Sequence, residues 1–411
     1  RNEEHLNQQL LGYAHKFRLP YFASNGAYYA DQRDRELLDL FTCIKNHCTI
    51  YDAGKLLSEN SERHLKSHAA MLDLFADLPE AVERTAEIAS KVDFSMDELS
   101  YSFPDYPVPP GETMNSFLRI QAEKGALNRY GEINEEVRKK LNHELGLIER
   151  KKLAGYFLMV WDISDFCKRE VNGKKILSQG RGSAANSVVC YSLGITAVDP
   201  IESKLLFERF LSENHDQYPD IDIDLPSGDD REQVIQYVYE KYKERGAAMT
   251  ANVISYRGRS AIREVGKVFG FDPDSLGQLS RLNAHYETFK GEELNHRLKK
   301  EGFDPADSNR LRKFSDLYTR ILQFPRHLGQ HSGGMVVSWS GLDGIVPIEP
   351  ASMEKRTIIQ WDKDDCEALK IVKVDLLGLG MMAVLRDSIE LIEHHHVSPV
   401  SGATMPSVSG T

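Results

Sequence analysis

Polar and apolar residues alternate in residues 219–225, and this alternation predicts a β-strand with one acidic face. Asp220, Asp222 and Asp224 stand at every second position, so their side chains leave a strand on the same side. Ionised carboxylates about 6.5 Å apart raise one another's pKa and weaken the strand. Mg²⁺ would relieve that repulsion, because it prefers hard oxygen ligands together with phosphates. The run therefore predicts either a metal–phosphate site or a solvated edge strand with an acidic outer face.

A short strand, a glycine-rich turn and a helix are predicted to follow one another in residues 175–193. This arrangement is typical of an anion-binding loop, because backbone N–H groups and a positive helix N-terminus are accessible and Arg181 adds a forked donor. We expect the loop to hold a triphosphate. Its candidate nucleotide-binding residues are Gly180, Arg181, Gly182 and Ser183.

The same turn also reads as a G-x-G-x-x-A pattern, which keeps a dinucleotide-binding unit open as an alternative. Such a unit needs an acidic residue about 20 positions further on, at the end of a second strand. Asp199 is near that position, but it precedes Pro200, and no clear strand leads into it. A nicotinamide-dependent oxidoreductase is therefore the least favoured hypothesis.

A basic stripe is predicted in residues 256–267, where Arg259, Arg263 and Lys267 are four positions apart on one helical face. The net charge of −11 excludes a uniformly basic surface, but a local stripe is enough to bind nucleic acid. The alternative is a charged helix face that meets only water. The candidate DNA-binding residues are Tyr256, Arg257, Arg259, Arg263 and Lys267.

Length and composition indicate a multi-domain protein of the cytoplasm. The 411 residues predict about two to four domains, and 41% of them are hydrophobic. We find no run of about 18 apolar residues and no cleavable leader, so we expect no membrane association. The five cysteines lack C-x-x-C spacing, which favours reduced thiols over disulfides or zinc.

Several long motifs, taken in order, resemble those of bacterial C-family DNA polymerases, and their sequences are more similar to the error-prone branch than to the replicative one. The resemblance covers nearly all of residues 19–391. The motifs lie at residues 155–158, 161–162, 179–187, 193–200, 206–211, 219–224, 324–328, 330–334, 359–365 and 373–379.

The resemblance implies an error-prone, translesion-type DNA polymerase core that transfers a nucleotide from dNTP to a primer 3′-hydroxyl. It implies two Mg²⁺ ions, replaceable by Mn²⁺, on Asp220, Asp222 and Asp375. Residues 372–376 alternate as in a strand, which places Lys373 and Asp375 on one side. Lys373 is expected either to neutralise phosphate charge or protonate the leaving group, or to form a plain salt bridge to a neighbouring acid. We expect Asp224 either to have a structural role or to support the metal-binding acids without binding the ions itself.

The resemblance further implies an α+β, multi-domain fold. It consists of a palm, with a mixed sheet of the polymerase β/nucleotidyltransferase type flanked by helices, and a helical thumb. The expected divisions are the end of a PHP domain (1–84), the palm (85–251 and 326–380), the thumb (252–325), and the start of the fingers with a disordered tail (381–411). Gly26 and Tyr28 replace residues that bind metal in the PHP domains of relatives, so we expect no complete PHP metal site.

Primer–template DNA and dNTP are the expected partners, with a sliding clamp and mutagenesis accessory proteins bound through segments that we do not find in these 411 residues. Because the fingers are not found, a non-catalytic scaffold that binds DNA or proteins in a damage-response complex is the second hypothesis. His331 is expected to be a packing or hydrogen-bonding residue and is left outside the predicted site.

Overall fold

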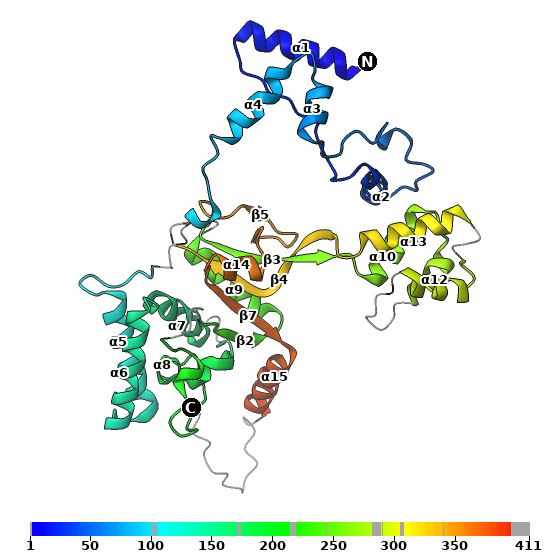
Figure 1. Cartoon of the computed structure of the whole chain (residues 1–411). Coiled ribbons are helices and arrows are strands. Elements are labelled where there is room, and N and C mark those ends of the chain that lie inside the picture. Colours follow the sequence, from blue (N-terminus) through cyan, green and yellow to red (C-terminus); the bar gives the residue numbers. More distant parts are fainter. Residues whose placement is uncertain are drawn as a thin grey trace. The chain divides into compact units, whose positions relative to one another are not determined.

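The computed structural model forms two compact units, which we call the helical unit and the sheet unit (Figure 1). The helical unit comprises Arg1–Ser95 and Ile254–His327, and the sheet unit comprises Met96–Val253 and Leu328–Thr411. The described residues are 2–99, 101, 105–170, 174–213, 219–243, 245–281, 289, 291–304, 308–339 and 341–395. Tyr218 and the predicted tail from residue 396 lie outside them.

The helical unit is built around a helix that comes from the N-terminal part of the chain. Leu40 of that helix, α2, is buried with Val265 of α10 and Phe314 of α13 in one hydrophobic core. The apolar positions of α10 recur three and four residues apart, so one face packs inward while the basic face stays in solvent. The helices are α1 (Asn2–Phe17), α2 (Arg35–Asn46), α3 (His68–Leu74), α4 (Pro79–Ala89), α10 (Gly258–Val268), α11 (Pro273–Arg281), α12 (Gly291–Lys300) and α13 (Asn309–Ile321), with short 3₁₀ turns η1 (Gln32–Asp34) and η2 (Gly54–Leu56).

Seven strands in the described part of the chain form one mixed sheet, in the order β1-β2-β7-β4-β3-β6-β5. The pairs β2·β7 and β3·β6 are parallel, whereas β1·β2, β4·β7 and β5·β6 are antiparallel. The strands are β1 (Gln179–Arg181), β2 (Asp222–Pro226), β3 (Ala247–Ser255), β4 (Pro325–Val337), β5 (Ile348–Pro350), β6 (Thr357–Ile359) and β7 (Lys373–Leu379). The α+β class with a mixed sheet flanked by helices is confirmed.

Helices surround this sheet and share its core. The most deeply buried is α7, whose sequence is apolar on nearly every side, as expected for a helix that does not meet water. The helices of the sheet unit are α5 (Met114–Tyr130), α6 (Glu135–Arg150), α7 (Ala154–Lys168), α8 (Val188–Ser192), α9 (Asp229–Tyr242), α14 (Lys363–Ala368) and α15 (Gly380–His395), with 3₁₀ turns η3 (Met96–Glu98), η4 (Gly182–Asn186) and η5 (Phe207–Arg209). None of the helices in the described residues is both long and apolar enough to cross a bilayer.

The alternation in residues 219–225 has the predicted effect. Ile221, Ile223 and Leu225 are completely buried and fix one face against the core, so the acids at even positions lie on the other face. The strand itself begins only at Asp222, and Asp220 lies on the approach to it. The short strand expected in residues 175–179 is displaced to Gln179–Arg181, because its pairing with β2 fixes it there.

Candidate metal centre and its surroundings

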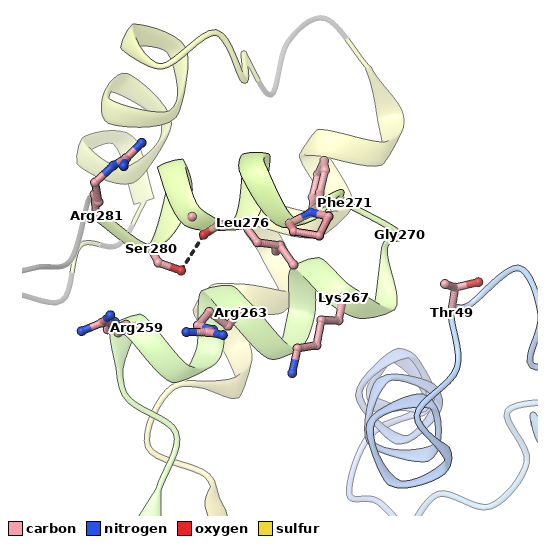
Figure 2. Close-up of a pocket in the computed structure, with 11 residues that line it drawn as sticks. Thr49, Arg259, Arg263, Lys267, Gly270, Phe271, Leu276, Ser280 and Arg281 are labelled. Atoms are coloured by element: carbon pink, nitrogen blue, oxygen red, sulfur yellow. Dashed lines mark hydrogen bonds between the residues drawn. The ribbon is translucent and has the colours of Figure 1, made fainter.

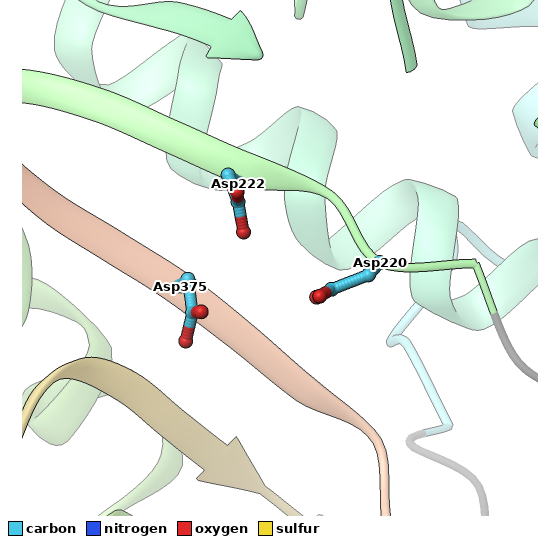
Figure 3. A group of neighbouring side chains, drawn as sticks. All are labelled: Asp220, Asp222 and Asp375. Carbon is cyan, nitrogen blue, oxygen red and sulfur yellow. The ribbon is translucent and has the colours of Figure 1, made fainter. Parts of the chain in front are cut away.

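Two distant acids become direct neighbours in the sheet. Strands β2 and β7 are parallel, and their register pairs Asp222 with Asp375. Asp220 approaches from the segment before β2, and Figure 3 shows the three side chains facing a common space. Each offers a carboxylate oxygen, and these oxygens lie within 4.8 Å of one another. The structure therefore brings together the three acids on which the sequence interpretation depended.

The carboxylates of this cluster are poorly satisfied. Within the described residues, Asp222 Oδ1 and Asp375 Oδ1 are buried and accept no hydrogen bond. Burial raises the pKa of Asp222, repulsion from Asp220 and Asp375 raises it further, and the nearby cations oppose the shift. A buried charged oxygen without a partner is costly, and a divalent cation with a preference for oxygen would satisfy it. The donor set fits Mg²⁺ or Mn²⁺.

Two basic side chains compensate part of this negative charge. Lys373 Nζ lies 2.6 Å from Asp375 Oδ2 and 3.6 Å from Asp220 Oδ1. Arg181 NH2 lies 3.3 Å from Asp222 Oδ2, and its Nε lies 3.3 Å from Asp224 Oδ1. Lys373 thus forms the salt bridge that was one of its two expected roles. Asp224 contacts the arginine and is not part of the three-acid cluster.

Gly334 lies on β4, the other neighbour of β7, and its lack of a side chain leaves room for Lys373. It is paired with Asp375, and a Cβ at this position would stand 3.0 Å from Lys373 Cδ and 2.6 Å from Thr250 Oγ1. The backbone N–H of Gly334 donates to His331 Nδ1 at 2.6 Å. His331 therefore has the hydrogen-bonding role that was expected of it, and it contacts the residue that flanks the acidic cluster.

The glycine-rich loop lies beside β2, with Arg181 paired to Asp222 across the sheet. Gly180 is buried, and a Cβ there would stand 2.7 Å from the carbonyl oxygen of Ile195, so glycine is required by packing rather than by a ligand. Gly182 has a φ of +76°, a left-handed conformation that favours glycine. Of the four predicted residues, Arg181 and Gly182 are exposed and Ser183 is half-buried.

One part of the anion-loop prediction is wrong, because the carboxyl group of Glu144 already occupies the N-terminus of α8. The Glu144 carboxylate accepts hydrogen bonds from the backbone N–H groups of Val188 and Val189, at 2.9 and 3.0 Å, and from Ser187 Oγ at 2.7 Å. Burial raises the pKa of Glu144 to about 7, although these hydrogen bonds act in the opposite direction. The first amides of this helix are therefore not available to a phosphate. The sequence carried no signal of this role, since Glu144 is one of several acids on an amphipathic helix.

The predicted basic stripe is only partly exposed. Arg257 reaches solvent from the position just before α10, and Arg259, Arg263 and Lys267 reach it from one face of the helix. Tyr256 does not, because it is 3% exposed and packs in the core of the helical unit. The prediction that Tyr256 binds DNA is therefore wrong, and this residue belongs to the hydrophobic core.

The chain has an α+β fold in which three acids gather on adjacent segments, an arrangement that could hold a divalent metal ion. More particularly, residues 116–378 match the family described as the bacterial DNA polymerase III alpha NTPase domain, and the chain belongs to this family of C-family polymerases. The resemblance stated from the sequence is confirmed.

Curated relatives place the chain nearest the error-prone branch. It is 42% identical over 390 residues to an error-prone DNA polymerase of Brucella abortus, covering 94% of this chain and 36% of the relative. It is 44% identical over 380 residues to an error-prone DNA polymerase of Rhodopseudomonas palustris, covering 92% and 32%. A third, from Bradyrhizobium diazoefficiens, is 44% identical over 376 residues, covering 91% and 32%. The chain thus spans about a third of the length of these relatives.

Proposed function

We propose that this chain is the nucleotidyl-transfer core of an error-prone DNA polymerase, which adds a nucleotide from dNTP to a primer 3′-hydroxyl. The observation that carries the proposal is the gathering of Asp220, Asp222 and Asp375. Asp222 and Asp375 each have a buried oxygen that lacks a hydrogen bond within the described residues. These acids would hold two Mg²⁺ or Mn²⁺ ions. Such ions lower the pKa of an attacking hydroxyl and neutralise charge on phosphate oxygens.

The basic residues around the acids have roles that follow from their position. Lys373 keeps an ammonium group 2.6 Å from Asp375, where it can balance charge on a bound triphosphate. Arg181 is half-exposed beside Asp222, and its forked donors suit phosphate oxygens. Exposed Gly182 and half-buried Ser183 extend the same loop, so we propose them as nucleotide contacts. Gly180 contributes indirectly, because only a glycine there allows the loop to pack against Ile195.

The exposed residues of α10 support a second part of the proposal. Arg257, Arg259, Arg263 and Lys267 would contact phosphates of primer–template DNA, which a local basic face can do despite the net charge of −11. The division into palm, thumb, PHP end and fingers stays a prediction. So do the translesion role, the cytoplasmic location and the clamp and accessory partners.

A metal titration tests the acidic centre directly in the 411-residue chain. We expect Asp222→Asn to weaken Mn²⁺ binding, measured by calorimetry, by at least about tenfold, since it removes charge from the middle of the cluster. Asp224→Asn is the matched control, with the same substitution on the same strand, and it should retain binding. Equal loss in both variants would show that general negative charge, rather than the three-acid cluster, holds the ion.

Primer extension tests the activity, and it should use the protein extended to the length of its relatives. Asp222→Asn and Asp375→Asn should abolish extension while DNA binding, measured by anisotropy, is unchanged. Extension by either variant would contradict the assigned roles. A protein without substitutions that binds DNA and manganese but never extends a primer would support the scaffold hypothesis instead.

A further inference from the structure

A cavity of about 660 Å³ lies in the helical unit between α10 and α11. Figure 2 shows Arg259, Arg263 and Lys267 in a row along α10, with Arg281 at the end of α11 on the side of Arg259. Four cationic residues therefore line one cavity, and none of its eleven lining residues is acidic. Arg281 was not part of the basic stripe read from the sequence.

Within the part of the chain that the structure describes, most of this positive charge has no carboxylate counterion. Lys267 Nζ lies 3.4 Å from Glu264 Oε1, but Arg259, Arg263 and Arg281 form no ion pair with any carboxylate in the described residues. Cations that line one cavity repel each other, and an anionic ligand relieves that repulsion. A phosphodiester carries a single charge, whereas a terminal phosphate carries about −1.5 to −2 at pH 7. The number of unpaired arginines favours the more highly charged ligand.

The other wall of the cavity is apolar. Phe271 lies edge-on to Phe314, with ring centroids 5.1 Å apart, and the Arg310 guanidinium covers its ring at 4.5 Å. Leu276 of α11 continues this wall, and a Cβ on Gly277 would meet no described atom within 4 Å other than its chain neighbours and its own helix backbone. The Ser280 hydroxyl already donates to the carbonyl of Leu276 at 2.6 Å. Specific polar recognition therefore comes from the cations, and the apolar wall leaves room for a sugar or base.

We propose that this cavity binds a terminal phosphate group attached to a nucleotide. Two sources share this chemistry, namely the 5′-phosphate at the end of a DNA strand and the polyphosphate of a free nucleotide. The inference rests on the proposed function only for the nucleotide character of the ligand. The cavity needs no metal, so its binding is independent of the acidic centre.

Fluorescence anisotropy on the 411-residue chain, with a chelator present, tests the proposal. The probes are two single-stranded oligonucleotides of one sequence, labelled at the 3′ end, with a 5′-phosphate or a 5′-hydroxyl. We expect the phosphorylated strand to bind at least about tenfold more tightly. The strand with a 5′-hydroxyl lacks the phosphate charge and therefore cannot form the charge-assisted hydrogen bonds to the arginines. Pyrophosphate and dNTP are added as competitors to identify the free-nucleotide source.

Variants show whether the cavity is responsible. Arg263→Gln and Arg281→Gln should remove the preference for phosphate, whereas Arg312→Gln, an exposed arginine of α13 outside the cavity, should keep it. Competition by pyrophosphate or dNTP without a preference between the strands would assign the site to free nucleotides. Equal binding of both strands with no competition would overturn the proposal, as would equal loss in Arg312→Gln. Because the chelator removes divalent ions from the assay, failure of the proposed metal binding cannot imitate either result.

Discussion

Glu144 offers the sharpest test of how this fold supports its candidate nucleotide loop. The residue is 2% exposed, and its carboxylate accepts three hydrogen bonds, two at Oε2 and one at Oε1. A glutamine at this position turns one oxygen into a donor. In either orientation of the amide, the N–H of Val188 or Val189 then faces another donor. Leaving one buried N–H group without an acceptor costs about 1–3 kcal/mol.

The pH dependence has a defined sign. Burial raises the pKa of Glu144 from its ordinary 4.5 to about 7 in the folded chain. Between these values the folded state holds the proton and the unfolded state has lost it. The stability from this group is therefore fully present below pH 4.5 and is lost as the pH rises through about 7. The pKa interval from 4.5 to about 7 corresponds to about 3 kcal/mol in the free energy of unfolding.

The assay is urea unfolding of the chain and of Glu144→Gln at pH 5 and pH 8. Tryptophan fluorescence is a suitable signal, because Trp161, Trp339 and Trp361 all lie in the sheet unit with Glu144. We expect the variant to be less stable by about 1–3 kcal/mol at pH 5, and the difference to shrink by up to about 3 kcal/mol by pH 8.

Glu136→Gln, an exposed acid in the first turn of the same helix, is the control for Glu144→Gln and should change stability by less than about 0.5 kcal/mol. A difference between the chain and Glu144→Gln that widens as the pH rises would refute the reasoning, because it would mean that the ionised carboxylate is the favoured form in the fold.

Two further predictions concern the acidic cluster. Gly334→Ala should destabilise the sheet unit by about 1–3 kcal/mol in urea unfolding, because its Cβ would stand 2.6 Å from Thr250 Oγ1; an unchanged midpoint would show that the strand can move. Lys373→Gln should tighten Mn²⁺ binding in calorimetry by about three- to tenfold, because an ammonium group 2.6 Å from Asp375 Oδ2 is removed. Unchanged affinity would show that the lysine does not oppose the ion.

The elements of the acidic centre could be predicted because they depend on local patterns. Alternation of buried Ile223 with Asp222 defines a strand face whatever the strand pairs with, and the same holds for Val374 and Asp375. Helix α6 at Glu135–Arg150 also depends on local features, since it has a capping Asn134 and a regular apolar face. The mixed sheet came from the family resemblance rather than from these patterns.

Other features depend on contacts between distant segments, which local patterns cannot show. Glu144 looks like any acid of an amphipathic helix until α8 is placed against it. Tyr256 adjoins a basic stripe in the sequence, but the core formed with α2 buries it. The position of β1 and the contribution of Arg281 to the cavity likewise arise from neighbours that the sequence does not identify.

The geometry of the acidic cluster follows from strand register, which the core fixes. A slip of one residue between β2 and β7 would place Ile223 or Leu376 opposite an acid and would turn one apolar set towards solvent. Both residues are completely buried, so such a slip would lose a large hydrophobic contribution. The apolar face of the sheet therefore holds Asp222 beside Asp375 against their mutual repulsion. For this reason we expect the acidic cluster to persist without a bound ion and to be available when one arrives.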